Sequence, residues 1–318
     1  MSLRKTAFLI LCLVLSFLSC KEDDNIISTF TPINLEEKQI EDNDAIISYL
    51  KTHYYNSSAF DSNNTNINNL VITEITEGGN VPAGSTLLDG NVEERFLVIG
   101  DVSYKYYILR INQGGGTNSP NFSDNVLIAY EGFRVADDFV FDSNLNPNPS
   151  ALDLTNTIRG WQLVIPSFNA AFDDIDNGDG TISYLNSGAG MLFIPSGLAY
   201  LFSDNPLQLQ PLIFKFELLK SFQNDHDGDG IPSYLEDING DGVFTLNSTG
   251  TNDGDDTDSN GVPNAFDSDD DGDGILSINE ITITTENRTT PEDVRMISLE
   301  DNQKLLDEIT KEDNGTFT

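Results

Sequence analysis

The chain is poor in cysteine and in basic residues, and each shortage excludes a class of protein. Its two cysteines, Cys12 and Cys20, both lie within the first twenty residues, so no disulfide or cysteine-based zinc site can stabilise the remainder of the chain. The chain has 16 Lys and Arg against 52 Asp and Glu, a net charge of −36 at pH 7. Such a surface repels nucleic acid and anionic lipid headgroups, which we therefore exclude as direct ligands.

Histidines and apolar residues are also few. His53 and His226 are the two histidines, too few for a histidine-rich metal site, and we expect each to be an ordinary surface or helix-face residue. Apolar residues make up 38% of the 318 residues, a low share for one continuous core. We expect some segments to bury little, and the length allows one or two domains with appendages.

The amino terminus has the pattern of an export signal. Arg4 and Lys5 precede an apolar run, residues 7–15, which is too short to span a bilayer. The run ends at Phe17-Leu18-Ser19-Cys20, which resembles a bacterial lipobox. The pattern predicts a signal peptide at 1–19 and membrane attachment through lipid on Cys20. An ordinary signal peptide with a chance cysteine is the alternative.

The segment after Cys20 bears on location. Lys21-Glu22-Asp23-Asp24 resembles the signal that sends lipoproteins of Bacteroidota to the outer face of the outer membrane. We therefore expect an outer-membrane lipoprotein of the cell envelope, exposed at the surface. A solvated charged tether would have the same composition, and residues 20–42 are expected to form such a tether.

Apolar spacing predicts helices and strands beyond the tether. Ile46, Leu50 and Tyr54 recur every four residues, which predicts a helix from about Asn43 within an N-terminal extension, residues 43–104. Many short apolar runs then surround one helical candidate, residues 160–172. This pattern predicts an α+β fold, with an antiparallel sheet wrapped over one short helix.

Several short segments lie in the order found in FKBP-type peptidyl-prolyl cis/trans isomerases. They are residues 106–109, residues 126–132, Phe141-Asp142-Ser143, Ile158-Arg159-Gly160-Trp161, residues 194–200 and residues 214–219. Residues 105–222 therefore resemble an FKBP domain, and the resemblance implies a half-barrel sheet with an apolar pocket between sheet and helix. Two positions depart from the family: residues 146–153 lack a Phe, and Tyr200 is followed by Leu201.

Isomerisation of a prolyl bond suits a pocket of this kind. Rotation breaks amide resonance, and the barrier is about 18–20 kcal/mol. The twisted amide tolerates an apolar environment better than the planar one, so a dry aromatic pocket favours it without a nucleophile or a metal. The resemblance implies that Trp161 is the floor of the pocket and Asp142 its polar group. It also implies that the walls are Tyr130, Phe141, Ile158, Tyr200 and Phe214.

From Ser221 the composition changes abruptly. No Lys or Arg occurs between Ser221 and Asn287, and acidic residues recur at alternate positions. Calcium loops need oxygen ligands at positions 1, 3 and 5, a Gly at 6 and a carboxylate at 12. Four loops start with this spacing, at Asp225, Asp237, Asp256 and Asp269; in the second, position 12 is Ser248 and the pattern is incomplete.

We expect these loops to bind structural calcium ions. The expected ligands are Asp225, Asp227, Asp229, Ile231 and Glu236 in the first loop, Asp237, Asn239 and Asp241 in the second, Asp256, Asp258, Asn260 and Asp267 in the third, and Asp269, Asp271, Asp273, Ile275 and Glu280 in the fourth. Segments such as Ile231-Pro232-Ser233 resemble thrombospondin type-3 repeats, in which calcium replaces a hydrophobic core. Residues 223–285 are thus expected to form an irregular calcium-bound stalk, and residues 286–318 a flexible tail with a helix at 299–309. A disordered acidic linker is the alternative.

These features predict a lipid-anchored prolyl isomerase that assists folding of exported or surface proteins. Its substrates would be proline-containing polypeptides, and catalysis would need no cofactor. One alternative is a non-catalytic module that binds proline-containing segments. Another is a calcium-stabilised adhesion or motility protein that uses the fold as a scaffold. Residues 173–187 would be an insertion, with a turn at Asp176-Asn177-Gly178-Asp179-Gly180 that lacks complete calcium-loop spacing.

Overall fold

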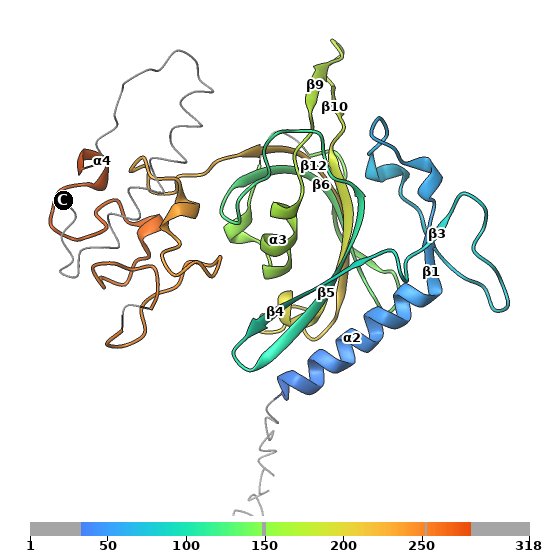
Figure 1. Cartoon of the computed structure of the whole chain (residues 1–318), viewed down its shortest axis with the longest axis horizontal. Helices are drawn as coiled ribbons and strands as arrows, with labels where there is room; N and C mark the ends of the chain where they lie inside the picture. The colour runs from blue at the N-terminus through green and yellow to red at the C-terminus, as the bar shows by residue number, and fades with distance from the viewer. Residues whose placement is uncertain (1–32, 148–150, 252, 281–318) are drawn as a thin grey trace, which may run out of the picture. The chain divides into compact units, whose positions relative to one another are not determined.

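The computed structural model describes residues 33–147, 151–251 and 253–280 (Figure 1). The lipobox, the expected helix at 299–309 and the tail lie outside these residues. Within them, no helix has both the length and the apolar character needed to cross a membrane. Few helices accompany antiparallel strands, so the predicted α+β class is confirmed.

The chain forms three kinds of element over these residues. The α-helices are α2 (Leu35–Thr52), α3 (Arg159–Val164) and α4 (Ser277–Glu280). The strands are β1 (His53–Tyr55), β2 (Ile72–Glu74), β3 (Thr86–Leu87), β4 (Glu93–Ile99), β5 (Val102–Asn112), β6 (Asn125–Arg134), β7 (Val140–Asn144), β8 (Leu152–Asp153), β9 (Asp173–Asp176), β10 (Ile182–Leu185), β11 (Gly188–Ile194) and β12 (Leu212–Phe222). The short 3₁₀ turns are η1 (Ser57–Ala59), η2 (Ile67–Asn69), η3 (Leu154–Asn156), η4 (Ile165–Ser167), η5 (Ser196–Leu198), η6 (Ser233–Glu236) and η7 (Asn264–Phe266).

A seven-stranded antiparallel sheet forms the centre of the fold. Its order is β4-β5-β11-β12-β6-β7, and β8 pairs with β6. All seven residues of β11 are buried. Strand β11 therefore has apolar packing on both faces, which explains why its sequence is a continuous apolar run with no polar alternation.

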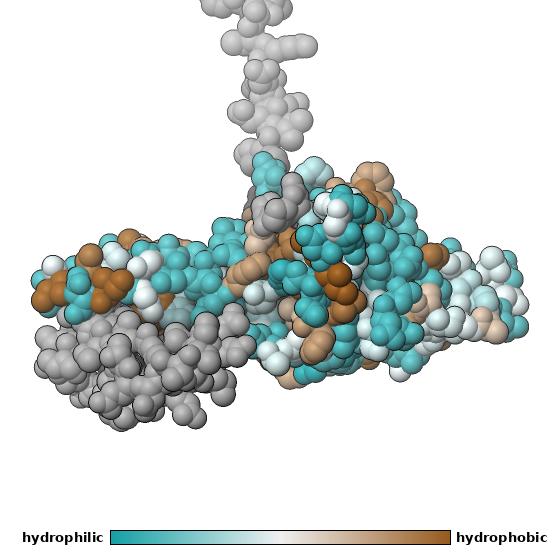
Figure 2. All heavy atoms as spheres, turned by 90° about the horizontal axis from the view of Figure 1, so that it is seen from above, coloured by the Kyte–Doolittle hydropathy of each residue, from teal (hydrophilic) through white to brown (hydrophobic). Residues whose placement is uncertain are grey.

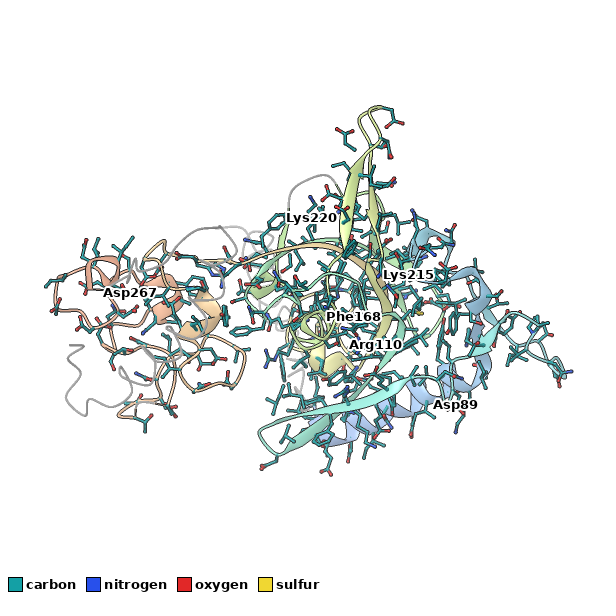
Figure 3. All side chains as sticks on the ribbon, turned by 45° about the horizontal axis from the view of Figure 1, so that its top comes forward. Asp89, Arg110, Phe168, Lys215, Lys220 and Asp267 are labelled. Carbon is teal, nitrogen blue, oxygen red and sulfur yellow. The ribbon has the colours of Figure 1, made fainter. Side chains whose placement is uncertain are left out.

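One face of the sheet packs on α3. Phe168, just after η4, is fully buried, and its ring meets Phe216 edge-on. The Arg110 guanidinium carbon lies over the Phe168 ring, 4.1 Å from its centroid (Figure 3). The predicted helix at 160–172 is shorter than expected. Pro166 lies in η4, and because it has no N–H it cannot continue the α-helical hydrogen bonding of α3.

The opposite face of the sheet packs on α2. Ile46, Tyr49 and Leu50 of this helix contact the side of the sheet that presents Phe193 and Ile213. In the pairing of β11 with β12, Phe193 lies opposite Ile213 and Leu192 opposite Phe214, so alternate residues face α2 and α3. The seven-stranded sheet is thus the middle layer between two helices.

Helix α2 begins at Leu35, so the prediction of a tether up to residue 42 was wrong over residues 35–42. The apolar spacing failed there because two of the residues that α2 buries in this stretch, Gln39 and Asp42, are polar. Asp42 is 1% exposed, and its Oδ2 accepts hydrogen bonds from the backbone N–H of Ser196 (2.7 Å) and from its hydroxyl (2.5 Å). Lys38 lies 2.8 Å from the other carboxylate oxygen.

Smaller elements surround this core. Strands β2, β1 and β3 form a separate sheet after α2, and the insertion after α3 forms the β9–β10 hairpin. The hairpin turns at the predicted Asp176–Gly180 segment, where Asn177 N–H donates to the Thr181 carbonyl. The face seen in Figure 2 is mainly hydrophilic with scattered apolar residues, as the large negative charge requires.

The buried Asp42 contact leads to a first prediction. Asp42→Ala leaves the Ser196 N–H and hydroxyl without an acceptor, and should lower the free energy of unfolding by about 2–3 kcal/mol. Urea denaturation followed by circular dichroism measures this change. Asp44→Ala, at an exposed position of the same helix, makes the same charge change and should shift the free energy by less than about 0.5 kcal/mol. Equal losses in the two variants would contradict the role of Asp42.

Candidate functional site

An aromatic cleft opens between α3 and the concave side of the sheet. Its volume is about 520 Å³. The lining residues are Tyr130, Asp142, Leu152, Asn156, Thr157, Ile158, Arg159, Trp161, Ala199, Tyr200, Ser203 and Phe214. A cleft of this size lies within the range of about 300–1,000 Å³ that is usual for ligand pockets, and its lining combines apolar rings with a few polar groups.

Trp161 is the centre of the cleft's aromatic set. Its ring meets Tyr130 edge-on at 5.1 Å between centroids and Phe214 edge-on at 5.5 Å. Phe141 in turn packs edge-on against Phe214 at 5.6 Å. Trp161 and Phe214 are each only 3% exposed, so the rings are fixed by their neighbours and cannot rotate to fill the cleft.

Two of the polar groups at the cleft, a phenol and a carboxylate, are in contact with each other. Tyr130 Oη donates a 2.9 Å hydrogen bond to Asp142 Oδ2. Burial and this bond raise the pKa of Tyr130 to about 12, and burial followed by the Asp142 charge raises the pKa of Tyr200. Both phenols are therefore neutral near pH 7, and because the single Tyr130 hydroxyl proton is donated to Asp142, Tyr200 is the phenol that can donate to a ligand in the cleft.

The structure brings together six of the seven residues predicted for the pocket. Tyr130, Asp142, Ile158, Trp161, Tyr200 and Phe214 line the cleft, whereas Phe141 lies behind Phe214. The two positions at which the sequence departs from the FKBP family can also be located in the structure. Leu201 is 2% exposed and is not a lining residue, while Leu152, in the stretch that lacks a Phe, lines the cleft.

One wall of the cleft was missed by sequence reasoning. Leu152, Asn156, Thr157 and Arg159 join the predicted Ile158 in lining it, so residues 152–159, which we call the wall segment, supply five of the lining residues. Its side chains are ordinary for a loop, and only its position directly before Trp161 could have indicated its role. Ala199 and Ser203, beside Tyr200, were missed in the same way.

Acidic-loop residues hold the wall segment from outside. The Arg159 guanidinium donates hydrogen bonds to the backbone carbonyls of Asp241, at 2.7 Å, and of Gly242. His226 lies with Nε2 3.0 Å from Asp153 Oδ2. The prediction of His226 as an ordinary surface residue was wrong: its side chain is 12% exposed and contacts the wall segment.

The four acidic loops share one backbone geometry. In each, the first Asp accepts a hydrogen bond from the position-6 glycine N–H, at 3.0, 2.8, 3.0 and 3.1 Å in chain order. Position 5 accepts from the position-7 N–H, as Asp229 does from Ile231 at 2.7 Å. Each position-6 glycine has a positive φ, between 74° and 96°, which only glycine adopts without strain. The sharp turn expected at position 6 is therefore present in all four loops.

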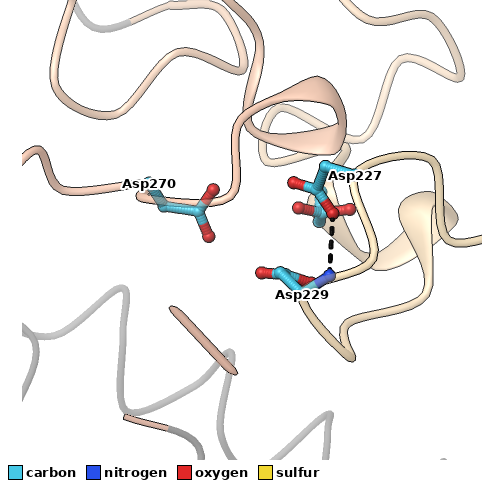
Figure 4. Close-up of side chains that lie close together, drawn as sticks. Asp227, Asp229 and Asp270 are labelled. Carbon is cyan, nitrogen blue, oxygen red and sulfur yellow. Dashed lines mark hydrogen bonds between the residues drawn. The ribbon is translucent and has the colours of Figure 1, made fainter. Parts of the chain in front are cut away.

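Four carboxylates converge between the first and the fourth loop. Oxygens of Asp227, Asp229, Glu236 and Asp270 lie within 4.8 Å of one another (Figure 4). Burial, and then the neighbouring carboxylates, raise the pKa of Glu236 to about 10 and that of Asp270 to about 8. Like charges this close cannot all ionise unless a cation offsets them.

Only some of the other predicted ligands lie close together. Asp269, Asp271 and Asp273 form a second close group, with oxygens within 4.8 Å. In the third loop, Asp267 Oδ2 lies 2.5 Å from Asn260 Nδ2. The second loop, incomplete in sequence, has its backbone held by Asp255, which accepts from the N–H groups of Ile238 and Thr245, both at 2.8 Å. The side chain of Glu280 lies outside the described residues.

Comparisons with known proteins match only part of the chain. Residues 226–307 match the family model described as BamM C-terminal, from the first acidic loop to beyond the described residues. No curated protein matches the chain. Among solved structures, FkpA from Escherichia coli has a weak similarity, with 22% identity and a TM-score of 0.30. That match covers 42% of this chain and 52% of FkpA, about half its length.

The packing of the cleft generates a second prediction. A Cβ added at Gly132 would lie 2.6 Å from Phe214 and 2.8 Å from Phe141. Gly132→Ala should therefore displace Phe214 from Trp161, lower the free energy of unfolding by about 1–3 kcal/mol, and shift the emission of the single tryptophan. Fluorescence and urea denaturation measure both effects.

Gly178→Ala is the matched control for this prediction. It lies at the tip of the β9–β10 hairpin with φ +75° and no atom within 4 Å of the new Cβ. It should cost about 1 kcal/mol through backbone strain alone and leave the tryptophan emission unchanged. An unaltered emission spectrum in Gly132→Ala would show that this glycine does not set the aromatic packing.

Proposed function

We propose that the chain is an FKBP-type peptidyl-prolyl cis/trans isomerase. The observation that carries the proposal is the aromatic cleft, with a fixed Trp161 at its centre and a Tyr130–Asp142 hydrogen bond beside it. The ordered sequence segments that resemble the FKBP family supply five of the lining aromatic and polar residues, Tyr130, Asp142, Trp161, Tyr200 and Phe214.

In this mechanism, the residues act by binding and by excluding water. The proline ring packs on the Trp161 face between Ile158 and Phe214, so the amide enters an apolar environment. Loss of conjugation makes the twisted amide less dependent on water than the planar one, and the cleft stabilises it preferentially. The neutral phenol of Tyr200 can donate to the substrate carbonyl, whereas the Tyr130 hydroxyl donates its proton to Asp142 and orients that carboxylate.

The proposed setting is the cell envelope. A cell-envelope location is compatible with the BamM C-terminal match of residues 226–307. Lipid on Cys20 would attach the chain to the outer membrane, with exposure at the outer face. The clients would be exported or surface proteins with proline-containing segments, and the acidic surface would not engage nucleic acid.

Calcium is the proposed structural cofactor of the acidic loops. The common loop geometry and the converging carboxylates fit a hard divalent cation that prefers oxygen ligands. These loops have few buried apolar residues, among them Ala265, so binding energy would supply much of their folding energy.

Isomerase activity is the third prediction. The full chain should accelerate cis-to-trans conversion of a proline tetrapeptide, and macrolide ligands should inhibit it. Trp161→Ala should lower kcat/KM about tenfold or more, equivalent to at least about 1.4 kcal/mol of transition-state stabilisation. A protease-coupled assay measures the rate.

Phe96→Ala is the control for this assay. Phe96 is 67% exposed on β4 and does not line the cleft, so its loss should leave kcat/KM unchanged. If the wild-type chain binds the peptide but does not accelerate its isomerisation, the isomerase proposal is wrong and a non-catalytic proline-binding module takes its place. Equal activity of wild type and Trp161→Ala would exclude the cleft as the site.

Calcium removal is the fourth prediction. In EGTA, residues 223–280 should become sensitive to protease, while the sheet core should remain protected, because the sheet has its own apolar core and the loops do not. Millimolar calcium should restore resistance, as mass spectrometry of the fragments would show. The same cleavage pattern in EGTA and in calcium would refute calcium as a structural cofactor.

A further inference from the structure

The cluster of Asp227, Asp229, Glu236 and Asp270 differs from the ligand set of a single calcium loop because its members come from two loops. Three members occupy positions 3, 5 and 12 of the first loop. Asp270 belongs to the fourth loop, where it occupies position 2, and the loop pattern assigns no ligand to that position. The cluster therefore joins two loops that are far apart in sequence.

The buried oxygens of this cluster lack hydrogen-bond partners. Both carboxylate oxygens of Glu236, a residue 3% exposed, are buried and unpartnered. So are one oxygen each of Asp227, of Asp229, which is 1% exposed, and of Asp270. Buried carboxylate oxygens without donors are costly, and a bound cation is the partner that would satisfy them together.

The distances suit calcium. Two oxygens on opposite sides of a Ca²⁺ ion, each at about 2.4 Å, are separated by about 4.8 Å. One oxygen from each of the four side chains lies within 4.8 Å of the other three, so one ion can contact all four carboxylates.

The fourth loop fixes the position of Asp270 through Ser277. Its N–H donates to Ser277 Oγ at 3.3 Å, across the loop from position 2 to position 9. The carboxylates of its neighbours Asp269 and Asp271 join Asp273 in the separate group of the fourth loop. The Asp270 carboxylate instead faces Asp227 and Asp229 (Figure 4).

We propose that one calcium ion is shared between the first and fourth acidic loops, with Asp227, Asp229 and Glu236 as ligands from one and Asp270 from the other. This inference rests on the proposed calcium binding and adds that the ion links two loops. Under this arrangement, the first loop cannot reach full order until the fourth has folded beside it. Ordering of the repeats by calcium is therefore cooperative between loops.

The test compares Asp270→Asn with Asp271→Asn in the full chain at saturating calcium. Both variants lose one carboxylate from the fourth loop. Asp270→Asn should weaken one calcium site about tenfold or more in a calorimetric titration, and should raise amide hydrogen exchange in residues 225–236. Asp271→Asn should raise exchange in residues 269–277 and leave residues 225–236 protected as in wild type.

The reverse variant completes the experiment. Glu236→Gln should raise exchange around Asp270, and amides of β11 should stay protected in all three variants, which shows that the sheet remains folded. If Asp270→Asn leaves both the hydrogen exchange of residues 225–236 and the calcium titration as in wild type, the shared site is overturned. Calcium binding by the loops would then still stand. A wild-type chain that takes up no calcium would overturn the proposed cofactor and the shared site together.

Discussion

Burial of the central strands on both faces is the constraint on which the rest of the structure depends. Because β11 has no exposed residue, it needs an apolar cover on each side, and α2 and α3 are those covers. Helix α3 is short and covers only part of the concave face. The uncovered part is where the aromatic rings of Trp161 and Phe214 meet and the cleft opens. The way in which α3 packs on the sheet therefore also determines where the cleft opens.

The N-terminal helix contributes more than cover. Asp42 of α2 reaches past the end of β11 to the backbone of Ser196, the first residue of the turn η5 that leads to Ala199 and Tyr200. On the other side of the cleft, Arg159 and the wall segment contact the acidic loops. Both sides of the cleft are thus braced by segments outside residues 105–222. A cleft braced in this way is more rigid than its own short turns alone would make it.

Much of this architecture was predictable because it depends on local patterns. Apolar runs indicated the strands, alternate carboxylates with glycine indicated the loop turns, and the ordered aromatic segments indicated six of the residues that line the cleft. The failures share a cause. The first turns of α2 bury Asp42, and His226 bonds to a distant Asp153, so each polar residue looked exposed until its partner was known. Asp270 was missed because its group is assembled from two loops, which no spacing rule describes.

The second position of the acidic loops shows how a repeat with few apolar residues can become one structure. In three loops its N–H donates to the position-9 side chain, from His226 to Ser233, Thr257 to Asn264 and Asp270 to Ser277. In the second loop, Asp255 accepts from both positions instead. These bonds close the first, third and fourth loops through a side chain of the same loop, and the second loop through Asp255, which follows it in the chain. The position-2 side chains of the first and fourth loops are then left to make contacts outside their loops, to the wall segment for His226 and to another loop for Asp270. Polar contacts at this one position therefore both close the loops and join the first and fourth loops to their surroundings.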